Sequence, residues 1–186
     1  INSPGDFRRT NVRGAIDRGD VVQPRRLGHI LLFSPDVRRK VAFYTDVLGM
    51  KLSDTVAGGA LAFMRCGGDS DHHVLALAGS DKPGFHHASF EIGSLDEIFV
   101  GARRLADAGY RDGWGQGRHV IGSNFFHYTR DPYMGLMEYF WDIDFVTEDC
   151  DWQIQDWNPE DAFYLWSTDG PPPADFVHNY EAAQQF

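Results

Sequence analysis

The sequence predicts an α+β fold built from two paired β-α-β-β-β modules that together form an incomplete barrel. Three observations support this prediction. The segment between residues 27 and 141 contains the same order of strand and helix signals twice, offset by about 58 residues. Each copy has a helix start between apolar, strand-like runs. Each copy also begins with a strand that carries a histidine at its third position, so the two imidazoles would face one shared cleft.

The first module, about residues 27–79, begins with the apolar run Leu27–Phe33, which is typical of a buried strand. The segment Ser34–Asp36, with proline in the middle, predicts a helix N-cap followed by proline at the first helical position. Apolar residues at helical spacing follow, and Gly49 is placed to end the helix in the left-handed conformation. Strand-like runs then lie near residues 50–54, 59–66 and 73–79.

The second module, about residues 85–141, begins with a strand over residues 85–92. Ser94 and Glu97 form a capping box that opens the second helix. The glycine-rich segment Gly113–Gly117 lacks the strand-to-helix setting of a phosphate loop, and we expect a turn at the rim of the cleft. Strand-like runs follow near residues 118–121, 124–129 and 135–141.

The two ends of the chain differ in charge. Residues 1–26 are rich in arginine with little apolar periodicity and predict an extended N-terminal arm. Residues 142–186 form an acidic, aromatic-rich C-terminal extension without Lys or Arg. Because exposed aromatic area is costly, we expect this extension to pack, either as a tail over its own domain or as an arm or lid that shapes a pocket or a subunit contact. Attraction between the two ends favours a homo-oligomer.

Composition narrows the classes of protein and partner. A chain of 186 residues, 42% of them apolar, can form one domain with a sizeable core. No apolar run approaches the length of a membrane-spanning helix, and we expect a cytoplasmic protein. The two cysteines, Cys66 and Cys150, form no CxxC pair, which argues against a disulfide framework or a thiolate zinc site. A net charge of -10 disfavours nucleic acid and anionic membranes as partners and favours a small molecule.

Two histidines and one glutamate stand out because of their positions. His29 and His87 occupy equivalent strands of the two modules. Alternation along the second of these strands places His87, rather than His86, on the polar face that would line the cavity. Glu138 lies in an apolar strand, where an unpaired carboxylate would be costly, and a bound cation would explain it. Two histidines and one carboxylate, with coordination positions left open, are the ligand set of non-haem Fe(II) oxygenases.

This pattern resembles the type I extradiol ring-cleaving dioxygenases of the vicinal oxygen chelate superfamily. The resemblance covers about residues 27–141 and includes the run Tyr-x-x-Asp-Pro-x-x-Gly-x-x-Glu-Tyr-Phe that contains Glu138. His73, His119 and Tyr128 match the family residue by residue, which makes the resemblance more specific than the ligand set alone. Because large family members carry a second, metal-free copy of the domain before this one, the chain resembles a one-domain member or the catalytic part of a longer product.

The resemblance implies cleavage of a catechol-type diol by O2 beside, not between, the two hydroxyl groups, with a ring-opened semialdehyde as product. The implied cofactor is Fe(II), with Mn(II) as the alternative because the same ligands accept both. The implied metal ligands are His29, His87 and Glu138. The implied catalytic residues are His73, His119 and Tyr128. His73 would assist O2 activation and proton transfer, and His119 and Tyr128 would hydrogen-bond the substrate oxygen.

Two alternatives stay open. One is a lyase or isomerase of the same superfamily that uses a redox-inert divalent metal. The other is a metal-free module that binds an aromatic compound or an antibiotic, usually as a dimer. The three candidate metal ligands argue against the second alternative.

Overall fold

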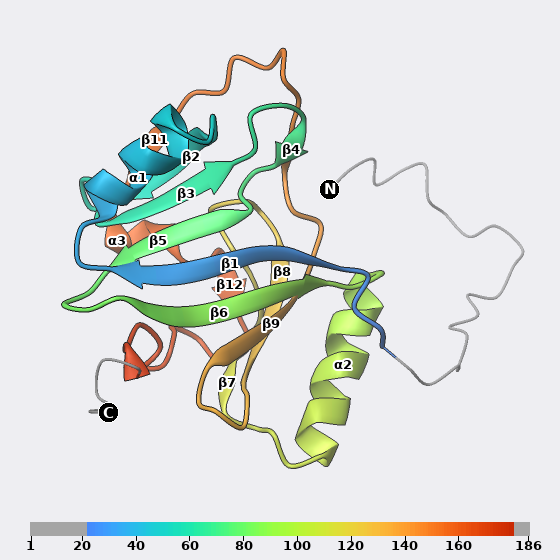
Figure 1. Cartoon of the computed structure of the whole chain (residues 1–186). Helices are drawn as coiled ribbons and strands as arrows, with labels where there is room; N and C mark the ends of the chain where they lie inside the picture. The colour runs from blue at the N-terminus through green and yellow to red at the C-terminus, as the bar shows by residue number, and fades with distance from the viewer. Residues whose placement is uncertain (1–21, 181–186) are drawn as a thin grey trace, which may run out of the picture.

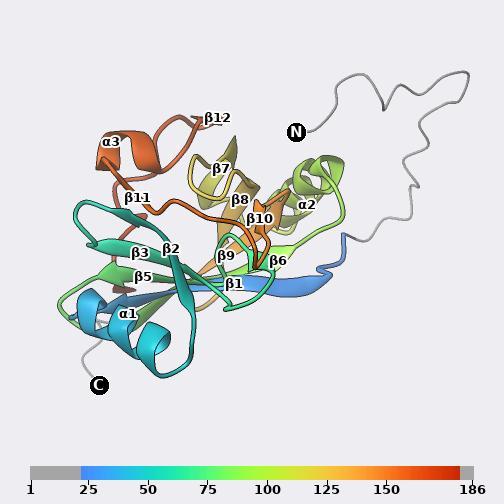
Figure 2. The same ribbon diagram turned by 90° about the horizontal axis from the view of Figure 1, so that it is seen from above.

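A computed structural model of the chain describes residues 22–180. Most of the predicted N-terminal arm, residues 1–26, lies outside this range. In the described part of the chain, ten strands form one sheet that is curved and open rather than closed (Figures 1 and 2), and the predicted α+β fold with an incomplete barrel is confirmed. The elements in chain order are β1 (Arg26–Ser34), α1 (Val37–Asp46), β2 (Lys51–Val56), β3 (Leu61–Arg65), β4 (Ser70–Asp71), β5 (Leu75–Gly79), β6 (Gly84–Glu91), α2 (Leu95–Asp107), β7 (Gly113–Arg118), β8 (Phe125–Arg130), β9 (Leu136–Trp141), β10 (Phe145–Val146), β11 (Gln155–Trp157), α3 (Pro159–Ala162) and β12 (Trp166–Ser167).

Two modules of the predicted order meet at the middle of the sheet. The strand order is β11-β2-β3-β5-β1-β6-β9-β8-β7-β12, with β4 and β10 forming a separate pair. The first strands of the modules, β1 and β6, pair antiparallel and lie side by side at the centre of Figure 1. Each also pairs in parallel with the last strand of its own module, β1 with β5 and β6 with β9. This pairing brings residues far apart in the sequence into neighbouring positions.

Both long helices begin at a side chain that accepts a hydrogen bond from the first turn. The carboxylate of Asp36 caps α1, accepting from a backbone N–H at 2.9 Å. The prediction placed the N-cap at Ser34 and the first helical residue at Pro35. It is wrong by two positions, because Asp36 supplies the acceptor and the helix begins at Val37. Ser94 caps α2 as predicted, accepting from the backbone N–H of Glu97 at 3.2 Å. No described helix is long and apolar enough to cross a membrane.

Alternate residues of the central strands point to opposite faces of the sheet. On one face, α1 covers the first module, and beneath it Ile30 and Leu32 of β1 pack against Leu75 and Leu77 of β5. Helix α2 covers the second module (Figure 1). The buried leucines of this set, Leu75 and Leu77, each contribute about 1.5–3 kcal/mol to stability. The intervening residues of β1, beginning with His29, face the other side of the sheet, where they line a cavity.

The glycine-rich segment Gly113–Gly117 belongs to strand β7 and is not the predicted turn. A side chain at Gly113 would collide with the backbone of Tyr128, and one at Gly117 with the ring of Phe126. The glycines therefore let β7 approach the bulky strand β8 closely. The strand predicted directly after the second helix, near residues 118–121, is therefore placed too late in the sequence, because β7 spans Gly113–Arg118.

The C-terminal extension packs on the domain and reaches both edges of the sheet. Strand β11 pairs with β2 at one edge, and β12 pairs with β7 at the other. Between these strands, Ala162 and Phe163 pack near the cavity, and farther along Phe176 packs against Trp114 and Tyr128. The described part of the extension thus lies over its own domain, and Ala162, Phe163 and Phe176 form part of the cavity wall.

Candidate metal centre and cavity

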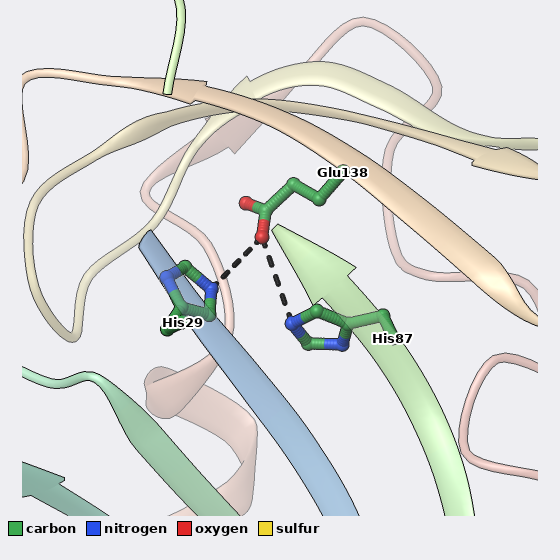
Figure 3. A group of neighbouring side chains, drawn as sticks. All are labelled: His29, His87 and Glu138. Atoms are coloured by element: carbon green, nitrogen blue, oxygen red, sulfur yellow. Dashed lines mark hydrogen bonds and ion pairs between the residues drawn. The ribbon is translucent and has the colours of Figure 1, made fainter. Parts of the chain in front are cut away.

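The three predicted metal ligands lie on neighbouring strands and point toward one another (Figure 3). His29 is on β1, His87 on β6 and Glu138 on β9. Within the sheet, Ser89 of β6 is paired both with His29 and with Glu138, so one row of the sheet carries two of the ligands. One side-chain nitrogen or oxygen of each ligand lies within 4.8 Å of the others. The topology thus brings together residues that are up to 109 positions apart.

One oxygen of Glu138 faces both imidazoles. Glu138 Oε2 lies 3.0 Å from His29 Nε2 and 3.6 Å from His87 Nε2. Two ligands bound at right angles, each about 2.1 Å from an ion, lie about 3.0 Å apart, so these separations suit a divalent cation. Asn124 Nδ2 donates to the other oxygen, Oε1, at 3.2 Å and orients the carboxylate.

The electrostatic state of the site also suits a cation. Burial alone would raise the pKa of the Glu138 carboxyl, but its interactions with the neighbouring imidazoles, that with His29 foremost, outweigh burial and hold the pKa well below its usual range. Burial lowers the pKa of His87 well below its usual value, so this ring is neutral. His87 Nε2 is buried and has no hydrogen-bond partner among the described residues. An unpaired buried nitrogen aimed at a carboxylate fits a divalent metal ion between them.

The predicted catalytic residues surround the same point. His119 Nε2 lies 3.0 Å from Tyr128 Oη and 3.6 Å from Glu138 Oε1. The ring of His73 lies 4.5 Å from that of His29, measured between centroids. Burial lowers the pKa of His73 well below its usual value and raises that of Tyr128 well above its own. At neutral pH His73 is therefore a neutral imidazole, and Tyr128 keeps its proton.

His86 lies beside the cavity, contrary to the prediction from strand alternation. Leu31 of β1 pairs with His87, whereas Leu32 pairs with Phe85, so His86 is the extra residue of a β-bulge. The bulge breaks the alternation and turns His86 toward the cavity, next to His87. Their Nδ1 atoms lie 2.7 Å apart, and His86 Nε2 lies 2.6 Å from the carbonyl oxygen of Phe176.

Asn124 is a site residue that sequence reasoning missed. It is fully buried and donates to Glu138, yet it precedes the apolar strand β8 and belongs to none of the quoted motifs. A polar residue at the start of an apolar strand is the signal that could have identified it. The contribution of the C-terminal extension was also incompletely predicted, because Phe163 and Phe176 contact the histidines through backbone carbonyl groups.

A cavity of about 270 Å³ is lined by His29 and His87, two of the three candidate ligands. Its volume lies just below the usual range of about 300–1,000 Å³ for small-molecule sites. Aromatic and small aliphatic side chains make up most of its wall, and the described lining residues include no Lys, Arg, Asp or Glu. The chemically active lining groups are His29, His73, His86, His87, His119 and Tyr128.

Known proteins are similar to this chain in sequence and in fold. A family model described as the Glyoxalase/Bleomycin resistance protein/Dioxygenase superfamily matches residues 26–139. Metapyrocatechase 2 of Cupriavidus necator is 44% identical over 180 residues, which are 97% of this chain and 54% of that protein. Biphenyl-2,3-diol 1,2-dioxygenase of Metapseudomonas furukawaii is 31% identical over 156 residues, 80% of this chain and 50% of that protein. The chain thus spans about half the length of the curated relatives it matches.

A solved structure with a similar fold is that of the Mn(II)-bound glyoxalase from Novosphingobium aromaticivorans. It superposes with a TM-score of 0.73 at 32% sequence identity and covers 82% of this chain and 49% of that protein. The matched family region includes both modules of the sheet and all three candidate metal ligands. The chain belongs to the Glyoxalase/Bleomycin resistance protein/Dioxygenase superfamily.

Proposed function

We propose that this chain carries the active site of an extradiol dioxygenase, which uses Fe(II), or Mn(II) in its place, to cleave a catechol-type diol with O2. The observation that carries the proposal is the convergence of His29, His87 and Glu138 on one buried point beside an apolar cavity. The sequence similarity to metapyrocatechase 2 supports the same reaction class. In this reaction both atoms of O2 enter the product, a ring-opened semialdehyde, and no further reductant is needed.

In the proposed site, His29, His87 and Glu138 hold the metal ion. When bound, the ion supplies electron transfer between an electron-rich diol and O2 held side by side. Three protein ligands leave coordination positions for both reactants, as in other sites with two histidines and one carboxylate. Asn124 keeps the carboxylate oriented from behind.

The remaining polar residues of the cavity move or hold protons. His119 Nε2 and Tyr128 Oη lie 3.0 Å apart. This pair can accept a hydrogen bond from a diol hydroxyl and hold the proton that the diol gives up. His73, whose ring lies 4.5 Å from that of His29, is neutral and can take up a proton during the reaction and return it to the product. Holding these groups around one substrate in a shielded cavity supplies much of the rate enhancement.

The cavity wall favours a diol without a charged substituent. The described lining residues include no lysine or arginine, so an acidic side chain on the ring would lose its hydration without gaining a partner. Phe63, Phe163 and Phe176 instead offer aromatic surface to the ring. We therefore expect catechol and its alkyl or aryl derivatives to react faster than catechols that carry a carboxylate.

The second candidate function is that of a superfamily lyase or isomerase. It is favoured by the likeness to the Mn(II)-bound glyoxalase, whose structure covers most of this chain. Such a reaction needs the ion only to polarise its substrate and consumes no O2.

Oxygen uptake separates the candidates. The full chain would be purified anaerobically, loaded with Fe(II) or Mn(II), and mixed with catechols while O2 consumption and visible absorbance are recorded. We expect one O2 consumed per catechol and a coloured ring-opened product. Metal binding without O2 consumption for any catechol would favour the lyase or isomerase, and absence of metal binding would favour the metal-free binding module. Glu138→Gln is the control that should consume no O2.

A further inference from the structure

Two segments of the C-terminal extension place a backbone carbonyl against a histidine of the cavity. The carbonyl oxygen of Phe163 lies 2.5 Å from His119 Nδ1, and that of Phe176 lies 2.6 Å from His86 Nε2. A carbonyl oxygen only accepts hydrogen bonds, so the imidazole nitrogen that faces it must carry a proton. The extension thereby determines which nitrogen of each ring is protonated.

For His119 the consequence is direct. A neutral imidazole that carries its proton on Nδ1 has an unprotonated Nε2. His119 Nε2 lies 3.0 Å from Tyr128 Oη, which then donates to it. The contact with Phe163 thus leaves His119 as the acceptor inside the cavity.

For His87 the effect passes through His86. The two Nδ1 atoms lie 2.7 Å apart, so one of them donates and the other accepts. His86 is buried and has no ion pair with a carboxylate among the described residues, which favours its neutral form. Because its proton is on Nε2, facing Phe176, His86 accepts at Nδ1. His87 therefore donates from Nδ1, and its Nε2, which faces Glu138, is unprotonated.

For His73 the same relay passes through His72. Their Nδ1 atoms lie 3.0 Å apart, and His72 Nε2 lies 3.4 Å from the carboxylate of Asp54. That carboxylate is held by the extension, because the backbone N–H of Gln155 and the indole N–H of Trp157 donate to it at 2.9 and 3.1 Å. His72 Nε2 has no hydrogen-bond partner among the described residues, and the negative charge of this carboxylate 3.4 Å away favours the proton of His72 on Nε2. His73 then donates from Nδ1 and keeps Nε2 unprotonated.

We propose that the C-terminal extension fixes the tautomers of His73, His87 and His119, so that each presents an unprotonated Nε2 to the cavity. The inference deepens the proposed function and rests on it where it concerns the metal, since an unprotonated Nε2 on His87 is the form that binds an ion. His86 and His72 are positioning residues that transmit the effect. The extension is thus a part of the active site rather than only a cover over it.

The tautomers can be measured in the metal-free protein, independently of activity. Long-range ¹H–¹⁵N spectra of the full chain labelled with ¹⁵N-histidine distinguish protonated from bare ring nitrogens, and single His→Gln variants assign the signals. We expect the Nδ1–H tautomer at His73, His87 and His119 and the Nε2–H tautomer at His72 and His86. An Nε2–H signal at His87, or an average of the two forms there, would overturn the inference.

Metal affinity tests whether the relay orients the ligand. His86→Phe removes the acceptor for His87, and we expect Mn(II) to bind about 10- to 100-fold more weakly in competition with a chelator. In His86→Gln the amide oxygen can accept the same hydrogen bond, so most of the affinity should return. His127→Phe is the matched control, because His127 is a half-buried histidine that does not line the cavity. Equal affinity in all of these proteins would refute the relay. If the unaltered chain binds no metal, the proposed function fails, and the tautomer spectra still decide the inference.

Discussion

Replacing Glu138 by glutamine tests the candidate metal centre most directly. The two side chains have nearly the same shape, so the variant removes the charge and leaves the packing unchanged. Because Oε2 of Glu138 faces both His29 Nε2 and His87 Nε2, a neutral amide there offers either a weak oxygen ligand or an N–H group that repels a cation. A residue that only orients a ligand already changes affinity by about 10- to 100-fold. We therefore expect loss of the ligand itself to weaken metal binding by at least about 100-fold.

The expected magnitude follows from the linkage between binding and folding. A ligand present at about 100 times its Kd stabilises the native state by about 2.7 kcal/mol. In a domain of this size each kcal/mol raises the Tm by about 2–4 °C, so Mn(II) at that concentration should raise the Tm by about 5–11 °C. After a 100-fold loss of affinity, the same Mn(II) concentration stabilises by only about 0.4 kcal/mol and raises the Tm by about 1–2 °C.

The assay is thermal unfolding of the metal-free protein, with and without Mn(II), followed by circular dichroism. Glu91→Gln is the matched control, because Glu91 lies on β6, beside the strand of Glu138, but forms an ion pair with Arg26 and is not a cavity residue. The control should keep the full Mn(II)-dependent rise in Tm. A rise in Glu138→Gln equal to that of the unaltered chain would refute the assignment of Glu138 as a metal ligand.

Three further predictions test the cavity and its surroundings. His73→Gln should keep Mn(II) affinity within about threefold but lower kcat by about 10²- to 10⁴-fold, and an unchanged kcat would contradict a role in proton transfer. Burial lowers the pKa of His86 to about 4, from 6.5 in the unfolded chain. Above pH 6.5 His86 is neutral in both the native and the unfolded states. As the pH falls from 6.5 toward 4, the unfolded chain binds a proton at this residue that the native state does not, so the unfolding free energy falls by about 1.4 kcal/mol per pH unit. Urea unfolding of the metal-free protein between pH 7 and 5 should therefore show a smaller loss of unfolding free energy in His86→Phe. In Gly28→Ala the added methyl group collides with the ring of Phe140, which should lower the unfolding free energy by about 1–3 kcal/mol and displace His29; full stability with unchanged Mn(II) binding would contradict this packing.

The duplicated modules were predictable because each strand and helix carries its own local signal. The capping box at Ser94 is such a signal, and so is Gly49, whose φ of 70° confirms the predicted left-handed end of the first helix. The errors lie where a neighbouring segment decides the outcome. Gly113–Gly117 has the composition of a turn, yet it forms a strand, because its three glycines lie where a side chain would collide with Phe126 or Tyr128 of β8. Local composition contains no information about that partner.

The candidate site was predictable to the extent that residue type carries its chemistry. The histidines and Glu138 are unusual at their positions, and the structure brings them together. The turn of His86 toward the cavity was not predictable, because a bulge changes the side on which a residue lies without leaving a mark in the alternation. The contacts from Phe163 and Phe176 were equally hidden, since every residue has a backbone carbonyl.

The relation between the modules also determines the shape of the site. In the antiparallel pair of β1 and β6, Ile30 lies opposite Ala88, and the approximate two-fold axis that relates the modules passes between them. His29 and His87 each lie one position from this centre, on opposite sides of it. The axis therefore exchanges the two histidines, and a site placed on it receives one from each module.

The carboxylate breaks this symmetry. In the second module Ser89 of β6 lies beside Glu138 of β9, and the corresponding residue of the first module, Leu31 of β1, lies beside Ala76 of β5. Ala76 thus holds the place that Glu138 has in the other half, and it lines the cavity. A second carboxylate there would fill the remaining space around the proposed ion. Because alanine ends at a methyl group, that side has no protein ligand, which in the proposed reaction would leave room for the diol and O2 to bind together.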